Sequence, residues 1–138
     1  QMTGMECNPI PVEITYGLER LCMFVQGKNN VFDLDWNNEG VKYKEVFFQA
    51  EKEFSAYNFE FANPDTFLKN FDSTENECKS LLEKKLSLPA YDQCLKASHI
   101  FNLLDARGVI GVAERTGYIT RIRELAKGCG SLWLSSQN

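Results

Sequence analysis

The sequence predicts an α+β protein: a mostly helical chain in which an N-terminal strand and helix precede a helical C-terminal domain. Two patterns support this fold class. Val12, Ile14 and Tyr16 alternate with other residues, a period of two that is typical of a strand with one apolar face. From Leu18 onward, apolar residues recur at intervals of three and four, which is the period of an amphipathic helix.

The first predicted domain, residues 1–43, contains this strand and the first helix. Gly27 follows the apolar stripe of that helix, and glycine is a common residue just beyond a helix end. Residues 28–43 are polar and rich in asparagine, which predicts an irregular connector. Within the connector, residues 37–40 read Asn-Asn-Glu-Gly, a strong turn signal.

The second predicted domain, residues 44–138, is expected to be helical. Asn63 and Pro64 predict a helix start, because asparagine caps free backbone N–H groups and proline fits the first helical position. The Leu88-Pro89 pair predicts another start, and a last helix is expected from about residue 111. Glycine costs about 1 kcal/mol relative to alanine inside a helix. The glycines of the last segment therefore predict either breaks in the helix or stabilisation by packing: Gly111, Gly117, Gly128 and Gly130.

The composition is that of an ordinary globular protein. The 138 residues are 43% hydrophobic and 25% charged, which argues against a disordered or fibrous chain. The net charge of −4 argues against a protein that coats nucleic acid. No apolar run approaches the roughly 18 residues that a membrane span needs, so we expect no membrane partner. Because the chain begins with Gln1, we expect it to be a piece of something larger.

Basic residues are concentrated towards the C-terminus. Residues 106–138 hold five basic and two acidic side chains, a net charge of +3. This charge fits the solvated face of a helix, or a surface that contacts RNA or an acidic partner subunit.

The cysteines predict neither a zinc site nor a disulfide scaffold. The five cysteines contain no C-x-x-C pair, and His99 is the single histidine, whereas structural zinc needs four closely spaced N or S ligands. We therefore expect reduced cysteines in a cytoplasmic protein, and a packed structural role for His99 rather than acid–base catalysis.

The most informative segment joins the predicted strand to the first helix. Arg20 lies in the first helical turn, where its guanidinium offers planar, permanently charged donors that suit a phosphate oxygen. Glu13 and Thr15 share the strand face of Gly17; the Glu13 carboxylate could help to hold a magnesium ion that bridges phosphates, and Gly17 lets a flat ligand approach the backbone. We predict an ATP-binding site at Glu13, Thr15, Gly17 and Arg20. The alternative is a salt-bridged amphipathic turn.

Residues 13–21, EITYGLERL, resemble motif 3 of the class II aminoacyl-tRNA synthetases, in which a hydrophobic-Glu-Arg sequence follows glycines and opens a hydrophobic helix. The chain as a whole resembles the alpha subunit of the bacterial heterotetrameric glycyl-tRNA synthetase, in order and over almost its entire length. Besides motif 3, the resemblance rests on residues 4–9, 30–34, 57–60, 88–92 and 99–107.

This resemblance implies that the strand and first helix belong to the antiparallel sheet of a class II catalytic domain. It implies that the full subunit uses ATP and Mg²⁺ to activate glycine as glycyl-adenylate and charges tRNA(Gly). The implied assembly is an alpha-subunit homodimer paired with beta subunits as α2β2. Arg20 matches the motif 3 arginine that grips the γ-phosphate of ATP and is the candidate catalytic residue. Glu6, which precedes motif 3, could bind the glycine ammonium; a surface carboxylate is the alternative.

The chain also departs from the family pattern. Motifs 1 and 2 are not in these residues and are expected upstream of Gln1, so we expect the 138 residues alone to be inactive. A non-catalytic helical module for assembly with the partner subunit or tRNA is the alternative function. Residues 110–115 read Ile-Gly-Val-Ala-Glu-Arg where the family has Ile-Ser-Val-Thr-Glu-Arg, so two hydroxyls that could cap the last helix are missing.

Overall fold

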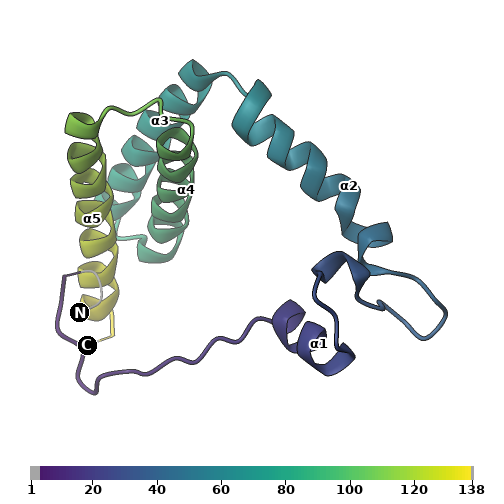
Figure 1. Cartoon of the computed structure of the whole chain (residues 1–138). Helices are drawn as coiled ribbons and strands as arrows, with labels where there is room; N and C mark the ends of the chain where they lie inside the picture. Colours follow the sequence, from purple (N-terminus) through teal and green to yellow (C-terminus); the bar gives the residue numbers. More distant parts are fainter. Residues whose placement is uncertain (1–3, 138) are drawn as a thin grey trace. The chain divides into compact units, whose positions relative to one another are not determined.

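The computed structural model describes residues 4–137, which form helices joined by loops (Figure 1). The chain divides into two compact units: one is Ile10–Phe61, and the other comprises the described residues outside that range. The elements in chain order are α1 (Leu18–Gln26), the 3₁₀ turn η1 (Val31–Asp33), α2 (Tyr43–Ala56), the π-helical turn η2 (Tyr57–Phe61), α3 (Pro64–Glu83), α4 (Ser87–Ala106) and α5 (Val112–Ser135).

Helices α3, α4 and α5 pack side by side as a three-helix bundle (Figure 1). The centre of its core has no exposed surface and is formed by Phe71, Cys78, Ala90, Ala97 and Leu104. Full burial of one large apolar side chain stabilises a fold by about 1.5–3 kcal/mol. The helical spacing of these apolar residues therefore accounts for the bundle.

The predicted starts of α3 and α4 are confirmed. Asn63 caps α3, because its side-chain oxygen accepts a hydrogen bond from the backbone N–H of Asp65 at 2.9 Å, and Pro64 occupies the first helical position. Helix α4 begins at Ser87, next to the predicted Leu88-Pro89 signal.

Helix α5 is continuous through its glycines. The backbone N–H of Gly111, the residue before the helix, donates to the Glu114 carboxylate at 3.1 Å, whereas no side chain at position 111 caps the first turn. A Cβ added at Gly128 would lie 2.9 Å from Leu82 Cδ1, so close packing against α3 explains this glycine. The helix packs against the core through Tyr118, Ile119, Ile122, Leu125 and Cys129, whereas Val112 at its start is 91% exposed.

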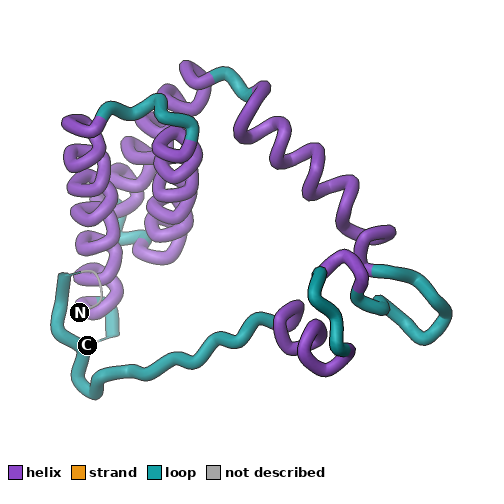
Figure 2. Tube along the Cα trace, in the orientation of Figure 1, coloured by secondary structure: helices purple, strands orange, loops and turns teal. Residues whose placement is uncertain are grey.

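The predicted strand is wrong, and with it the α+β fold class. Residues 4–137 contain no strand and no sheet, and residues 10–17 form a loop that leads into α1 (Figure 2). Alternation fixes which side chains share a face, but a strand also needs a neighbour that accepts and donates backbone hydrogen bonds. No such bond joins residues 10–16 to another described segment, and Val12 is 87% exposed. The described chain is mostly helical.

Two further predictions for the Ile10–Phe61 unit are confirmed. Helix α1 ends at Gln26, and Gly27 follows it with φ +63° in the left-handed region that glycine tolerates. The turn at residues 37–40 forms because the Asn37 side-chain oxygen accepts from the backbone N–H groups of Glu39 and Val41, at 3.0 and 3.1 Å.

The predicted domain boundary between residues 43 and 44 stays a prediction, since the two compact units reflect packing within the described residues alone. None of the helices in that part of the chain combines the length and the apolar character that crossing a membrane requires.

Candidate functional site

The predicted ATP-binding residues lie in one short stretch that leads into α1. Glu13 and Thr15 are both exposed, and Thr15 Oγ1 donates a hydrogen bond to Glu13 Oε1 at 2.5 Å. A carboxylate has acceptor sites on both oxygens, so Glu13 retains capacity to bind a cation or a further donor. The structure thus brings these two side chains together and leaves acceptor sites of the Glu13 carboxylate available.

Gly17 is needed for its backbone conformation. Its φ is +77°, a region that other L-residues rarely adopt, while nothing lies within 4 Å of the position that a Cβ would take. The Gly17 carbonyl accepts a hydrogen bond from the backbone N–H of Leu21 at 3.2 Å. The chain therefore turns from loop into helix at this residue. The space beside the Gly17 backbone, where we predicted that a flat ligand could approach, is open.

Arg20 is an exposed side chain in the first turn of α1. Among residues 4–137 it has no hydrogen bond and no ion pair, so the alternative of a salt-bridged turn is not seen there. The neighbouring Glu19 contacts the connector instead: the Tyr43 hydroxyl donates to Glu19 Oε1 at 3.5 Å. The Arg20 guanidinium is consequently available to an anion. The positive end of the α1 dipole, at the same helix start, also favours a bound anion.

Glu6 is exposed and lies in the other compact unit. Its predicted place beside the ATP-binding residues therefore stays a prediction.

The described residues do not form a complete metal site by themselves. No group of three or more His, Cys, Asp or Glu side chains in residues 4–137 is arranged to hold a metal ion. Mg²⁺ commonly takes one or two protein carboxylates and completes its octahedron with substrate phosphates and water. Glu13 matches that role in donor type, as a single carboxylate.

Helix α1 contains no buried residue and rests on the connector and α2. Beneath it, Trp36, Tyr43 and Phe47 form an aromatic cluster, with ring centroids of Tyr43 and Phe47 separated by 4.7 Å and those of Trp36 and Phe47 by 5.3 Å. A cavity of about 330 Å³ lies at this contact, lined by Leu18, Glu19, Cys22, Leu34, Asp35, Trp36, Tyr43 and Phe47.

The sequence interpretation missed the residue that fixes the end of α1. Gln26 Nε2 donates to the Asp35 carbonyl oxygen at 3.1 Å, and Gln26 Oε1 accepts from the Asp35 backbone N–H at 2.8 Å. The Asp35 carboxylate forms an ion pair with Lys42, the residue before α2. No local motif indicates these bonds, because they join residues nine positions apart through an irregular connector.

In the bundle, three of the five basic side chains of residues 106–138 are engaged internally. Arg115 pairs with Asp105 at 3.1 Å, Arg107 donates to the Ala62 carbonyl oxygen, and Arg121 binds two carboxylates. The other two basic side chains, Arg123 and Lys127, are exposed and have no ion pair in the described chain. Two such cations are few for a broad RNA-binding face.

The Arg121 cluster is structural. Arg121 Nε donates to Glu75 at 3.0 Å, Arg121 Nη2 lies 2.7 Å from Asp72, and the guanidinium stands 4.6 Å from the ring centroid of Phe71. Glu75 is buried, and its hydrogen bond with Arg121 holds the pKa of its carboxyl below the usual value, with Lys79 adding to the effect. Burial against these partners ties α3 to α5.

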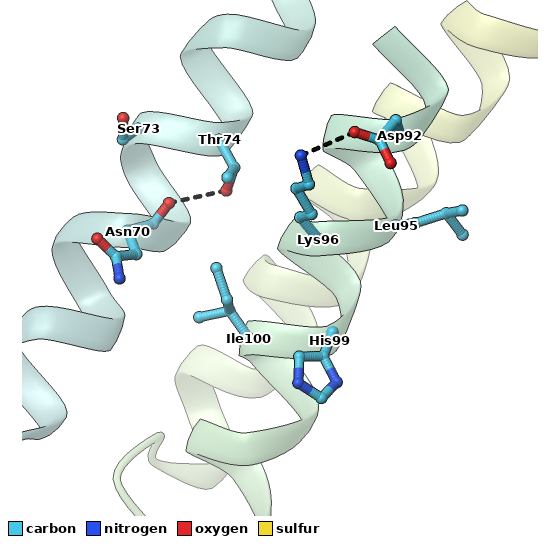
Figure 3. A pocket seen from close by; sticks show the side chains of 8 residues that line it. All are labelled: Asn70, Ser73, Thr74, Asp92, Leu95, Lys96, His99 and Ile100. Carbon is cyan, nitrogen blue, oxygen red and sulfur yellow. Dashed lines mark hydrogen bonds and ion pairs between the residues drawn. The ribbon is translucent and has the colours of Figure 1, made fainter. Parts of the chain in front are cut away.

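A shallow groove between α3 and α4 has a volume of about 480 Å³ and is lined by Asn70, Ser73, Thr74, Asp92, Leu95, Lys96, His99 and Ile100 (Figure 3). Three of its polar side chains have partners: Thr74 donates to the Asn70 carbonyl at 2.8 Å, and Lys96 pairs with Asp92 at 2.8 Å. His99 lies on this face and is exposed, so the packed role predicted for it is wrong. The groove brings no nucleophile–base pair together.

Three cysteines occupy the bundle core. Cys78 and Cys129 have their sulfurs 3.9 Å apart, and Cys94 is buried near them. Burial raises the pKa of the Cys78 thiol to about 12 and that of Cys94 to about 11. Such thiols remain protonated at neutral pH and are poor nucleophiles.

Comparison with known families places the chain among the aminoacyl-tRNA synthetases. Residues 1–138 match the family described as glycyl-tRNA synthetase alpha subunit, and the chain belongs to that family. Its role is therefore that of a glycine–tRNA ligase component in protein biosynthesis.

Proposed function

We propose that residues 13–20 bind the triphosphate of ATP when the complete ligase activates glycine to glycyl-adenylate. The observation that supports this proposal most directly is the state of Arg20. It is exposed at the start of α1 and makes no competing ion pair in residues 4–137. The donors of Arg121 are used by Asp72 and Glu75, whereas those of Arg20 are available, and Arg20, unlike the exposed Arg123, lies in the first turn of a helix.

In the proposed reaction, a carboxylate oxygen of glycine attacks the α-phosphorus of ATP, a new P–O bond forms, and pyrophosphate leaves with the electrons of the broken bond. The Arg20 guanidinium donates to oxygens of the γ-phosphate and draws the pyrophosphate into line with the attacking oxygen. Gly17 leaves room for the nucleotide beside the helix start. The proposal assigns Glu13 and Thr15, which share a hydrogen bond, to the same site.

The proposal assigns ion and amino-acid contacts as well. When bound, Mg²⁺ neutralises charge on the phosphate oxygens, and Glu13 is the carboxylate that would hold it. Glu6 would accept a hydrogen bond from the glycine ammonium. The nucleophile is the substrate's own carboxylate, so no side chain has to act as a general base.

We further infer an assembly of two alpha and two beta subunits, with tRNA(Gly) as the acceptor of glycine. The family name specifies an alpha subunit, which supports a second kind of subunit. In the Ile10–Phe61 unit, apolar side chains are more than 70% exposed, which is unusual for a surface that stays in water. These side chains are Ile10, Val12, Ile14, Leu18, Phe24, Val25 and Phe61. The same observation supports the second candidate function, a non-catalytic module that assembles with another protein surface.

Kinetics of the complete enzyme that contains this chain distinguish the two functions. Arg20→Ala should raise the KM for ATP in glycine-dependent ATP–pyrophosphate exchange by about 10- to 100-fold, because a charged hydrogen bond contributes about 1.5–3 kcal/mol. Arg20→Lys should recover only part of the loss, since lysine lacks the planar pair of donors. Arg123→Ala, an exposed arginine of α5, is the matched control and should leave exchange unchanged.

Unchanged exchange kinetics in Arg20→Ala would remove Arg20 from the site and favour the assembly module. Glu13→Gln and Glu6→Gln divide the remaining assignments. The first should raise the Mg²⁺ concentration needed for half-maximal exchange, and the second should raise the KM for glycine while leaving that for ATP in place.

A further inference from the structure

We propose that Gln26 is a positioning residue for the ATP site: through its two hydrogen bonds to the backbone of Asp35, it fixes the orientation of α1 and so of Arg20. This inference rests on the proposed function of Arg20. Gln26 does not contact the proposed ATP-binding residues; it occupies the opposite end of the same helix.

The contact has the geometry of a pairing between backbone segments. The Gln26 side-chain amide donates to the Asp35 carbonyl at 3.1 Å and accepts from the Asp35 N–H at 2.8 Å. An amide that uses its donor and its acceptor on one peptide residue restricts both the distance and the rotation between helix and connector. A single hydrogen bond would leave the helix free to turn about it.

Asp35 is itself held on its other side. It forms an antiparallel bridge with Lys42, and its carboxylate forms an ion pair with the Lys42 ammonium. The Tyr43 N–H, at the start of α2, donates to the Leu34 carbonyl at 2.8 Å. Gln26 therefore connects α1 to a connector that is already fixed to α2.

Helix α1 needs this connection because little else restrains it. None of its nine residues is buried, and its other polar contact, between Tyr43 and Glu19, is long at 3.5 Å. Apolar contact alone allows a short helix to slide or roll, because it has no preferred direction. A roll of α1 would swing the long Arg20 side chain away from the phosphate that it has to meet.

The test is a double-mutant cycle in the complete enzyme. Gln26→Met keeps the length and the helix propensity of the side chain but removes both hydrogen bonds. Gln49→Met, on α2, is the matched control, because the exposed Gln49 donates only to Glu53 within its own helix. We expect Gln26→Met to raise the KM for ATP in exchange by about five- to tenfold, equivalent to about 1–1.4 kcal/mol, with the KM for glycine unchanged.

Coupling to Arg20 separates positioning from a general loss of structure. In an Arg20→Ala background, Gln26→Met should have no further effect on the KM for ATP, because the side chain that Gln26 positions is gone. Equal effects in both backgrounds, or a loss of active enzyme with an unchanged KM for ATP, would overturn the inference. If Gln26→Met fails to assemble, Gln26→Glu, which keeps the acceptor and loses the donor, is measured in the same cycle with the same criteria.

The two proposals fail in different ways. If Arg20→Ala itself leaves the KM for ATP unchanged, the proposed function is wrong. If Arg20→Ala raises that KM while Gln26→Met behaves like Gln49→Met, the ATP site stands and the role assigned to Gln26 is wrong.

Discussion

Replacement of Arg121 by alanine tests whether this side chain stabilises the three-helix bundle. The change removes hydrogen bonds to Glu75 and Asp72 and the stacking of the guanidinium on Phe71. It leaves Glu75, which is 5% exposed, with Lys79 as its remaining charged partner at 2.9 Å. A buried carboxylate that loses its main partner bears a desolvation cost that the remaining contacts no longer offset.

The expected loss follows from those contacts. Breaking a buried ion pair on one side costs about 3–5 kcal/mol. The side chain of Arg121 is 35% exposed and Lys79 still neutralises Glu75, so we expect the lower part of that range or less. We therefore expect a loss of about 2–3 kcal/mol, which lowers the Tm of a bundle of this size by roughly 10–20 °C.

The assay is thermal unfolding of the 138-residue chain followed by circular dichroism of its helices. Arg123→Ala provides the matched control: it removes an exposed arginine from the same helix and should change the free energy of unfolding by no more than about 0.5 kcal/mol. A Tm for Arg121→Ala that equals that of Arg123→Ala would refute the assignment of Arg121 to the structural core.

The effect should also depend on pH in one direction. The pKa of Glu75 is lowered in the folded chain, so the ionised form is the one that stabilises the fold. That contribution is complete above the pKa of an unfolded glutamate, about 4.3, and is lost as the pH falls through the lower folded value. The difference in Tm between Arg121→Ala and the unaltered chain should be full at pH 7 and shrink below about pH 4. A difference that is constant from pH 7 to pH 3 would contradict this explanation.

Two further predictions concern α5 and the cysteines. Gly117→Ala should stabilise the chain to chemical denaturation by about 0.5–1 kcal/mol, because nothing lies within 4 Å of the added Cβ and alanine is the better helix former. Gly128→Ala should gain less than Gly117→Ala or lose stability, because its Cβ would lie 2.9 Å from a leucine of α3; a larger gain would contradict the packing described. In alkylation followed by mass spectrometry at pH 8, the exposed Cys22 should react first. Cys78 and Cys94 should react only after unfolding, since burial raises the pKa of their thiols to about 12 and 11; early labelling of either would show that the core is open.

Local signals explain which elements could be predicted from sequence. The start of α3 depends on Asn63 and Pro64, which satisfy the helix N-terminus without help from distant residues. The end of α1 depends on Gly27 for the same reason. Of the two alternatives for the glycines of α5, breaks or stabilisation by packing, the helix shows no break, and Gly128 packs closely against Leu82 of another helix. No local pattern contains that contact.

The predicted strand was wrong for a related reason. Alternation at Val12 and Ile14 describes which side chains share a face, whereas a strand also requires a partner for its backbone. The candidate site shows the same division between local and distant information. The place of Arg20 in the first turn of α1 and the turn at Gly17 follow from neighbours in sequence. The contacts of Gln26 do not, because they depend on how the connector places Asp35.

The contrast between Arg20 and Arg121 links these observations to function. Both are arginines near the start or middle of a helix, but Arg121 uses its donors on Asp72 and Glu75, whereas Arg20 has no ion pair in residues 4–137. A guanidinium that the fold already satisfies would have to break internal bonds before it bound a phosphate, and that cost would reduce its affinity. Arg20 bears no such cost, provided that α1 holds it in place. The proposed ATP site therefore depends on a helix that is fixed by its far end, through Gln26, while its near end remains open to the substrate.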